Sequence, residues 1–220
     1  AAVAAALGVS PEAVLPCSTG VIGQPLPKGV IEAAAPSLVE ALSEQGADAF
    51  AEAILTTDKG KKTAHRRVSL PGGAVTLLGV CKGAGMIHPN MATTLGFVFT
   101  DAKASPAFLR AALRRAADAT FNRISVDGDT STNDTLAIMA SGLAGNEEIT
   151  EKNADYALFT EALTAAFRQV ARKLAADGEG ATKLVIGKVK GAKDEATAKT
   201  IAKSVICSSL VKAAMFGADA

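Results

Sequence analysis

The clearest pattern in the chain is a run over residues 151–176 in which apolar side chains recur at alternating steps of three and four residues. This spacing is the period of an amphipathic helix, which buries one face and leaves the other in water. The apolar residues of this run are Tyr156, Phe159, Leu163, Phe167, Val170 and Leu174. A second helix is predicted from Pro106 to about Thr120, because Ser105 is a preferred N-cap residue and proline is favoured in the first turn. Its inner face would contain Leu109, Leu113 and Ala116.

The rest of the chain alternates shorter β-rich and helical runs. Residues 63–70 and 74–81 are β-rich and are joined at Pro-Gly-Gly, which predicts a hairpin. Three further β-rich runs predict strands at 14–18, 93–100 and 183–190. Three further helices are predicted at 30–43, 48–53 and 195–214, the last with Ile201, Val205 and Ile206 facing inward. Long helices beside hairpin-linked strands favour an α/β fold, a layered sandwich with a mostly antiparallel or mixed sheet and flanking helices.

The composition excludes several classes of function but says less about the fold. The 220 residues include 23 Lys and Arg against 22 Asp and Glu, a net charge of +1. This balance gives no bulk attraction to nucleic acid or to an anionic membrane, and we expect neither as a partner. Cys17, Cys81 and Cys207 are odd in number and far apart, so we predict no disulfide framework and no zinc cluster. A reducing cytoplasm is therefore the expected location.

The longest stretch without a charged side chain is 83–100. Glycines and the triplet His-Pro-Asn interrupt it, so it is not a membrane helix. Such a segment is expected in the protein interior, where its polar groups need partners or a task. Gly83 and Gly85 also resemble the start of a dinucleotide fingerprint, but His88 occupies the place of the third glycine and the segment follows a hairpin. We therefore reject that fingerprint.

Residues 126–135 resemble a calcium-binding loop only in part. Thr132 stands where the loop needs glycine, and Ile138 where it needs a closing glutamate, so no metal is predicted. The preferred interpretation is a polar turn whose Asp and Asn residues cap a helix that begins near Asn133.

A basic cluster leads into the predicted hairpin and consists of Lys59, Lys61, Lys62, Arg66 and Arg67. The favoured interpretation is a solvated strand edge kept from aggregating by its charge, and the alternative is a site for an anion or nucleic acid. Of the two histidines, His65 is assigned to an exposed strand face and His88 to a structural hydrogen bond in a loop.

Five long motifs then occur in order along almost the whole chain. They are C-S-T-G-V-I-G-Q-P-L-P, I-L-T-T-D, C-K-G-A-G-M-I-H-P-N-M-A-T-T-L-G-F-V-F-T-D, F-N-R-I-S-V-D-G-D-T-S-T-N-D-T and A-A-D-G-E-G-A-T-K-L. Together they resemble the ornithine acetyltransferase (glutamate N-acetyltransferase) family of arginine biosynthesis. The resemblance implies an N-terminal-nucleophile-like form of the α/β fold.

The same resemblance implies that the chain cuts itself between Ala92 and Thr93, and that Thr93 then becomes the nucleophile that accepts the acetyl group. A threonine hydroxyl is a poor nucleophile, but the free α-amine of the same residue, with a pKa of about 7.7–8.0, is a base within reach. The resemblance assigns the oxyanion hole to the hydroxyl of Thr19 and the backbone N–H of Gly20. Loss of such a donor typically lowers the rate on the order of 100-fold or more.

By resemblance, the substrate-binding residues are Thr56, Lys82, Thr93 and Glu179. Lys82 suits a substrate carboxylate and Glu179 an ammonium group, although which end of the substrate each residue binds stays open. The implied reaction is a ping-pong transfer of acetyl from N-acetylornithine to glutamate, with no metal or redox cofactor and with acetyl-CoA as an alternative donor. The implied assembly is a hetero-tetramer of two α and two β chains.

On this interpretation residues 1–92 are part of the α-chain without its N-terminal portion, and residues 93–220 are part of the β-chain without its C-terminal portion. The two halves would share one active site. One alternative is an autoproteolytic amidase or aminopeptidase of related architecture, which Thr93 disfavours because those enzymes use serine. The other is a non-catalytic amino-acid-binding fragment, which would bind acetylornithine without turnover.

Overall fold

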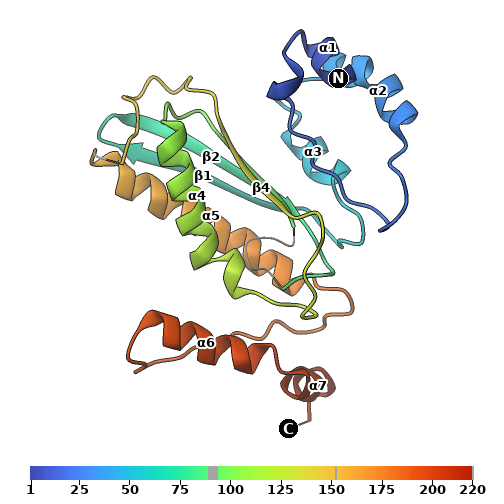
Figure 1. Cartoon of the computed structure of the whole chain (residues 1–220). Helices are drawn as coiled ribbons and strands as arrows, with labels where there is room; N and C mark the ends of the chain where they lie inside the picture. The colour runs from blue at the N-terminus through green and yellow to red at the C-terminus, as the bar shows by residue number, and fades with distance from the viewer. Residues whose placement is uncertain (89–93, 152, 220) are drawn as a thin grey trace. The chain divides into compact units, whose positions relative to one another are not determined.

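The computed structural model describes residues 1–88, 94–151 and 153–219, which form two compact units (Figure 1). The first unit is Ala1–Ala53 and the second is Ile54–Ala220. Buried hydrophobic side chains in the described part of the first unit are all alanines, namely Ala4, Ala35 and Ala51. The second unit contains the sheet and a continuous hydrophobic core.

The first unit is helical. It contains α1 (Ala2–Leu7), a short 3₁₀ helix (Pro11–Ala13), α2 (Lys28–Glu40) and α3 (Ala47–Ala53), and α1 packs against α2. The helices predicted at 30–43 and 48–53 are confirmed with slightly different ends. The strand predicted at 14–18 is wrong, because these residues have no regular secondary structure. No described strand in this unit offers them the backbone partners that a strand needs.

The second unit is built on a sheet of four strands in the order β1-β2-β3-β4. The strands are β1 (Lys62–Leu70), β2 (Gly73–Lys82), β3 (Leu95–Thr100) and β4 (Thr135–Ala140). The first two form the predicted antiparallel hairpin, in which Leu70 pairs with Gly73 across the turn. Gly73 has φ +131°, a conformation that favours glycine. β3 is antiparallel to β2 and parallel to β4, so the sheet is mixed, as predicted.

Two helices cover one face of this sheet, α4 (Pro106–Ala119) and α5 (Asp155–Ala176) (Figure 1). Both are confirmed predictions, and the Ser105 side chain accepts the N-cap hydrogen bond from Phe108 N. The buried face of α4 runs along Phe108, Ala112 and Ala116, with Leu109 and Leu113 half-buried beside it. The ring of Phe108 meets that of Phe159 edge to face at 5.3 Å, which joins the two helices. The predicted layered α/β class is therefore confirmed.

The segment after residue 133 differs from its prediction. It forms β4 instead of a helix, and the residues before it form a polar loop. β3 and β4 are parallel, so the chain must cross over between them, and α4 makes that crossover. The pairing with β3 satisfies the backbone groups that a capped helix would have satisfied internally.

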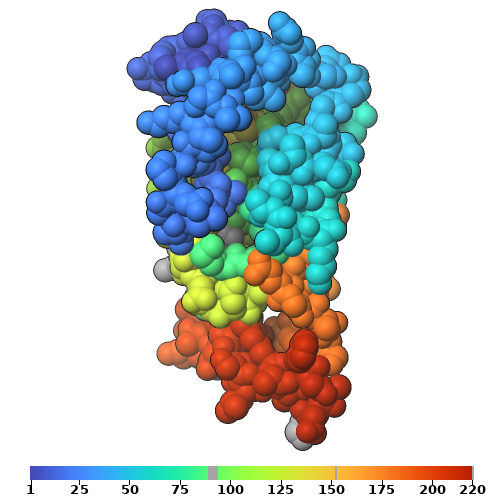
Figure 2. Space-filling model, turned by 90° about the vertical axis from the view of Figure 1, so that its right-hand side faces the viewer, coloured from blue at the N-terminus to red at the C-terminus, as the bar shows by residue number. Residues whose placement is uncertain are grey.

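The last forty residues contain the remaining corrections. Residues 183–190 form no strand, and the helix predicted at 195–214 is divided into α6 (Glu195–Ile206) and α7 (Ser209–Gly217), which are bent by 55°. The break follows from Ser208, whose hydroxyl caps α7. Ile201 and Val205 are exposed instead of facing inward. In Figure 2 the red surface of α6 and α7 adjoins the yellow-green loop that contains Val126, whose carbonyl accepts from Lys212 Nζ at 2.7 Å.

Among the described residues, no single helix has both the length and the apolar character needed to cross a membrane, and only the bent pair α6 and α7 meets those two criteria jointly.

Candidate functional site

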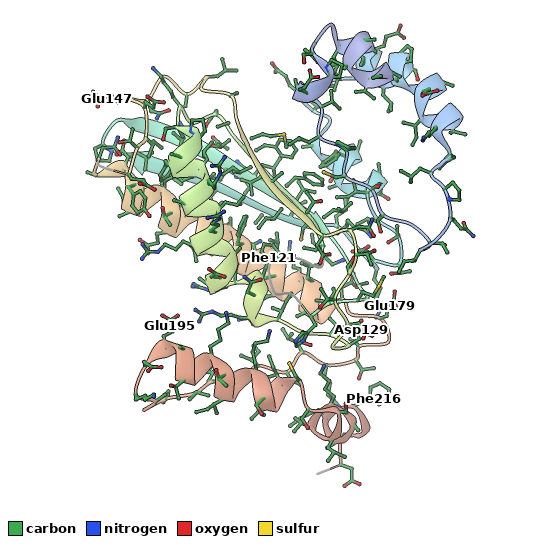
Figure 3. The ribbon with its side chains drawn as sticks, viewed as in Figure 1. Phe121, Asp129, Glu147, Glu179, Glu195 and Phe216 are labelled. Carbon is green, nitrogen blue, oxygen red and sulfur yellow. The ribbon has the colours of Figure 1, made fainter. Side chains whose placement is uncertain are left out.

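Three segments meet at one place in the second unit. The loop before β1 carries Thr56 and Thr57, β2 ends at Lys82, and Glu179 follows α5. Figure 3 shows Glu179 beyond the C-terminal end of α5, at the opposite end of that helix from Glu147. The sheet and α5 therefore fix two of these segments, and hydrogen bonds attach the third to them.

Lys82 is a buried cation at the end of β2, with a residue exposure of 7%. Its Nζ donates to Thr56 Oγ1 at 2.7 Å. Burial lowers the pKa of this ammonium group, and the nearby Asp58 carboxylate opposes that shift while Lys62 adds to it. A partly desolvated ammonium group of this kind is well suited to bind a carboxylate.

Glu179 is exposed but closely held. Its Oε1 accepts from Thr57 Oγ1 at 2.6 Å, and its backbone N donates to Ala84 O at 2.8 Å. A Cβ atom at Gly85 would lie 2.9 Å from the Glu179 carboxylate, so only glycine leaves that space free. The Gly-Ala-Gly segment after Lys82 therefore positions the Glu179 carboxylate.

Thr56 and Thr57 are consecutive residues with differently charged partners. The Thr56 hydroxyl accepts from the Lys82 ammonium group, and the Thr57 hydroxyl donates to the Glu179 carboxylate. The two threonines of this exposed loop therefore contact one buried ammonium group and one exposed carboxylate. Such a pair is complementary to a small molecule that carries one charge of each sign, as amino acids do.

A buried ion cluster lies beneath these residues. Lys62 Nζ is 2.5 Å from Asp58 Oδ1 and 2.5 Å from Asp177 Oδ2, and the side chains of Lys62 and Asp58 are 2% and 0% exposed. The interpretation of the basic cluster as a solvated edge is therefore wrong for Lys62. The sequence does not indicate this cluster, because Asp177 lies 115 residues from Lys62, but Asp58 stands two residues after Thr56 and Asp177 two residues before Glu179.

Asp58 also accepts hydrogen bonds from two backbone N–H groups. Its carboxylate accepts from Gly83 N at 2.6 Å and from Thr56 N at 3.3 Å. Burial alone would raise the pKa of Asp58, but the hydrogen bonds from Lys62, Gly83 and Thr56 outweigh it, and the pKa lies below its ordinary value. Gly83 has φ +147°, which favours glycine at this turn.

The polar loop before β4 has a different role from helix capping. Asp127 accepts from the backbone N atoms of Met86 and Ile87 at 2.6 and 2.9 Å. Met86 has φ +51°, a conformation that side chains rarely adopt, and the two hydrogen bonds hold it there. The loop thus anchors the segment that leads out of the Gly-Ala-Gly turn.

His88 has the structural role predicted for it, since its Nδ1 lies 3.1 Å from Ser125 Oγ. Burial lowers the pKa of His88, and the charges of Lys203 and Lys212 lower it further. His65 is exposed on β1, also as predicted.

A pocket of about 680 Å³ is lined by residues of α6 and α7 and by the segment that follows α5. Glu179 borders it, as do Glu195 and Phe216, which Figure 3 labels on α6 and α7. Thr56 and Lys82 are not among its lining residues, so the contact between these two side chains lies outside this pocket.

The structure brings together Thr56, Lys82 and Glu179, three of the residues predicted to bind substrate. Ala92 and Thr93 lie outside the described residues. Thr19 and Gly20 lie in the first unit, in an exposed stretch without regular secondary structure. Within the described ranges, no group of three or more His, Cys, Asp or Glu side chains is arranged to hold a metal ion.

Comparison with known proteins gives a consistent family. The ArgJ family model matches residues 1–220. The arginine biosynthesis bifunctional protein ArgJ of Symbiobacterium thermophilum is 51% identical over 217 residues, which cover 99% of this chain and 54% of that protein. The protein of the same name from Bacillus subtilis is 48% identical over 217 residues, which cover 99% and 53%. The chain thus spans about half the length of the curated relatives it matches.

A solved structure is also similar. The crystal structure of arginine biosynthesis bifunctional protein argJ from Bacillus halodurans matches with a TM-score of 0.56 and 50% sequence identity, over 58% of this chain and 60% of that chain. The likeness confirms the fold class that the motifs implied.

Proposed function

The chain belongs to the ArgJ family, and on this premise we propose that it transfers an acetyl group from N-acetylornithine to L-glutamate in arginine biosynthesis. The observation that carries the proposal is the pair of opposite charges on consecutive threonine hydroxyls, Lys82 on Thr56 and Glu179 on Thr57. Both substrates carry a carboxylate and an ammonium group, and this pair offers a partner for each.

The proposed nucleophile is Thr93, released by self-cleavage of the Ala92–Thr93 bond. In the precursor, the Thr93 hydroxyl oxygen attacks the Ala92 carbonyl carbon, and the peptide C–N bond breaks as an ester forms. Water then hydrolyses the ester, which leaves a carboxylate on Ala92 and a free α-amine on Thr93. This amine is the base that the reaction needs near neutral pH.

Transfer follows in two halves. The Thr93 oxygen attacks the acetyl carbonyl of N-acetylornithine, the amide C–N bond breaks, and ornithine leaves with the proton taken from the hydroxyl. The amine of glutamate then attacks the acetyl ester, and the proton that it loses returns to the Thr93 oxygen. We propose that Thr19 and Gly20 stabilise the negative oxygen of each tetrahedral intermediate.

A contact of the next residue in the chain supports this placement of the chemistry. Thr94 follows the proposed nucleophile directly, and its hydroxyl donates to the backbone carbonyl of Lys82. The chain beside the proposed cleavage site is thereby attached to the residue proposed to bind the substrate carboxylate. Cytoplasmic location, an assembly of two α and two β chains, and acetyl-CoA as a second donor remain predictions of the same proposal.

The test combines mass and activity of the full chain. Denaturing mass spectrometry is expected to show two pieces that meet between Ala92 and Thr93 in protein that forms N-acetylglutamate. The Thr93→Ala variant is expected to stay uncut and inactive. An intact chain that still transfers acetyl groups would overturn the mechanism, and release of free acetate in place of N-acetylglutamate would favour a hydrolase.

A further inference from the structure

Lys62 connects the two charged halves of the candidate site although it belongs to neither. Its Nζ is 2.5 Å from a carboxylate oxygen of Asp58 and 2.5 Å from one of Asp177. The residue is 2% exposed, which excludes a direct contact with a dissolved substrate. Lys62 begins β1, so the sheet fixes the position of its backbone.

Asp58 connects Lys62 to the segments around Lys82, the cation of the candidate site. Asp58 accepts from Gly83 N, directly after Lys82, and from Thr56 N, whose hydroxyl accepts from Lys82. The Asp58 carboxylate therefore holds both the backbone that follows Lys82 and the threonine that contacts its ammonium group, and Lys62 contacts that carboxylate in turn.

Asp177 connects Lys62 to the segment that carries Glu179, the anion of the candidate site. Asp177 precedes Glu179 by two residues and also accepts from Lys59 N at 2.9 Å. The one residue between them, Gly178, is buried and packs closely against Val126, since a Cβ atom there would lie 2.6 Å from that side chain. A shift of Asp177 would therefore be passed on to Glu179.

We propose that Lys62 is a positioning residue that sets the spacing between Lys82 and Glu179 and thereby the substrate length that the site accepts. This inference rests on the proposed function, in which those two side chains bind the opposite charges of one substrate. A rigid site discriminates against one added or missing methylene by roughly 10–200-fold. A site whose charged partners move independently accepts the longer and shorter molecules almost equally.

The experiment compares three acetyl donors on the full chain. They are N-acetylornithine, N-acetyllysine, which has one more methylene, and N-acetyl-2,4-diaminobutyrate, which has one fewer. The wild type is expected to favour N-acetylornithine in kcat/KM on the order of 10-fold or more. In Lys62→Met and in Asp177→Asn this preference is expected to fall to within about threefold.

The ratio separates positioning from mere stabilisation. If Lys62 only stabilises the fold, its loss lowers kcat/KM for all three donors together and the preference is unchanged, which would overturn the proposal. If Lys62→Met does not fold, Asp177→Asn decides, because it keeps the Asp58 pair and neutralises a carboxylate that is 14% exposed. Glu195→Gln is the matched control, since it removes an exposed ion pair outside the site and is expected to leave the preference intact.

The same compounds separate failure of this proposal from failure of the proposed function. A wild-type chain that transfers no acetyl group from any donor overturns the proposed function. The Kd values of the three compounds, measured by calorimetry, then test the positioning role: a length preference in the wild type that is lost in Asp177→Asn supports it. An equal preference in both proteins, or no binding by any compound, overturns it.

Discussion

Two ion-paired groups in the second unit differ in how much water reaches them. In the cluster beneath the candidate site, the side chains of Asp58, Lys62 and Asp177 are 0%, 2% and 14% exposed. In the pair between Arg123 and Glu195, the side chains are 40% and 76% exposed. The attraction between ions is weakly screened in the first group and strongly screened in the second. Ion pairs of the same chemistry therefore differ in their contribution to stability when their burial differs.

Removal of one side chain also has different consequences in the two groups. If Lys62 is removed, two carboxylates lose the ammonium group that pairs with both of them, and less of their desolvation is offset. If Glu195 is removed, water replaces it beside Arg123. Removal of Lys62 is therefore expected to cost much more stability than removal of the Glu195 charge.

The first prediction concerns Lys62→Met, which keeps the aliphatic stem and removes the ammonium group. We expect the free energy of unfolding to fall by about 3–5 kcal/mol, because breaking a buried ion pair leaves uncompensated charge. Urea denaturation measures the change.

The triple variant with Asp58→Asn and Asp177→Asn added is the control for this prediction. It contains no unpaired charge, so we expect it to recover most of the lost stability. A loss below about 1 kcal/mol in Lys62→Met would show that the cluster behaves like a surface pair.

The distance in sequence between contacting segments explains which parts of the fold the sequence could predict. The helix α5 and the β1–β2 hairpin depend on contacts within or next to the segment itself, so the hydrophobic period was sufficient. β4 instead depends on its pairing with β3 across the α4 crossover, and a short apolar run cannot specify such a distant partner. For the same reason the alternation at 183–190 was misleading, since no described strand pairs with it.

The candidate site likewise contains residues that the sequence indicates and a contact that only the fold shows. The motifs indicated Thr56, Lys82 and Glu179, and the structure brings them together. A run of basic residues is usually exposed, so the sequence predicts a solvated edge for Lys62. The available signal was Asp58 four residues earlier, but its other partner is Asp177, 115 residues away, and only the fold shows that pairing.

The second prediction concerns Glu179, an exposed carboxylate that the Thr57 hydroxyl holds in position. Gly85→Ala would put a methyl group 2.9 Å from the Glu179 carboxylate and force it to move. We expect acetyl transfer to fall on the order of 10–100-fold, because small misplacements of a binding group are costly, with little change in Tm. Gly60→Ala is the matched control, since nothing lies within 4 Å of its added methyl group. Equal activity of the two variants would contradict a positioned Glu179.

The third prediction uses pH. Burial lowers the pKa of Lys82, so its proton is lost at a lower pH than that of an ordinary lysine, and binding of a substrate carboxylate should weaken as pH rises through that value. The Asp58 carboxylate raises this pKa, so Asp58→Asn should move the alkaline limb of kcat/KM for glutamate to lower pH. A pH–rate series measures the limb. A limb that stays in place, or moves to higher pH, would show that the Asp58 charge does not act on Lys82.

The smallest effect is expected at the exposed pair. Glu195→Gln keeps the shape of the side chain and removes the charge that faces Arg123. The Arg123 side chain also donates to the backbone carbonyl of Asp118, so it keeps a partner after the change. We expect no measurable shift of Tm at ordinary ionic strength, and no difference between wild type and variant when salt is raised. A large loss of stability here would mean that burial does not separate the two groups, and the role assigned to Lys62 would then lose its physical basis.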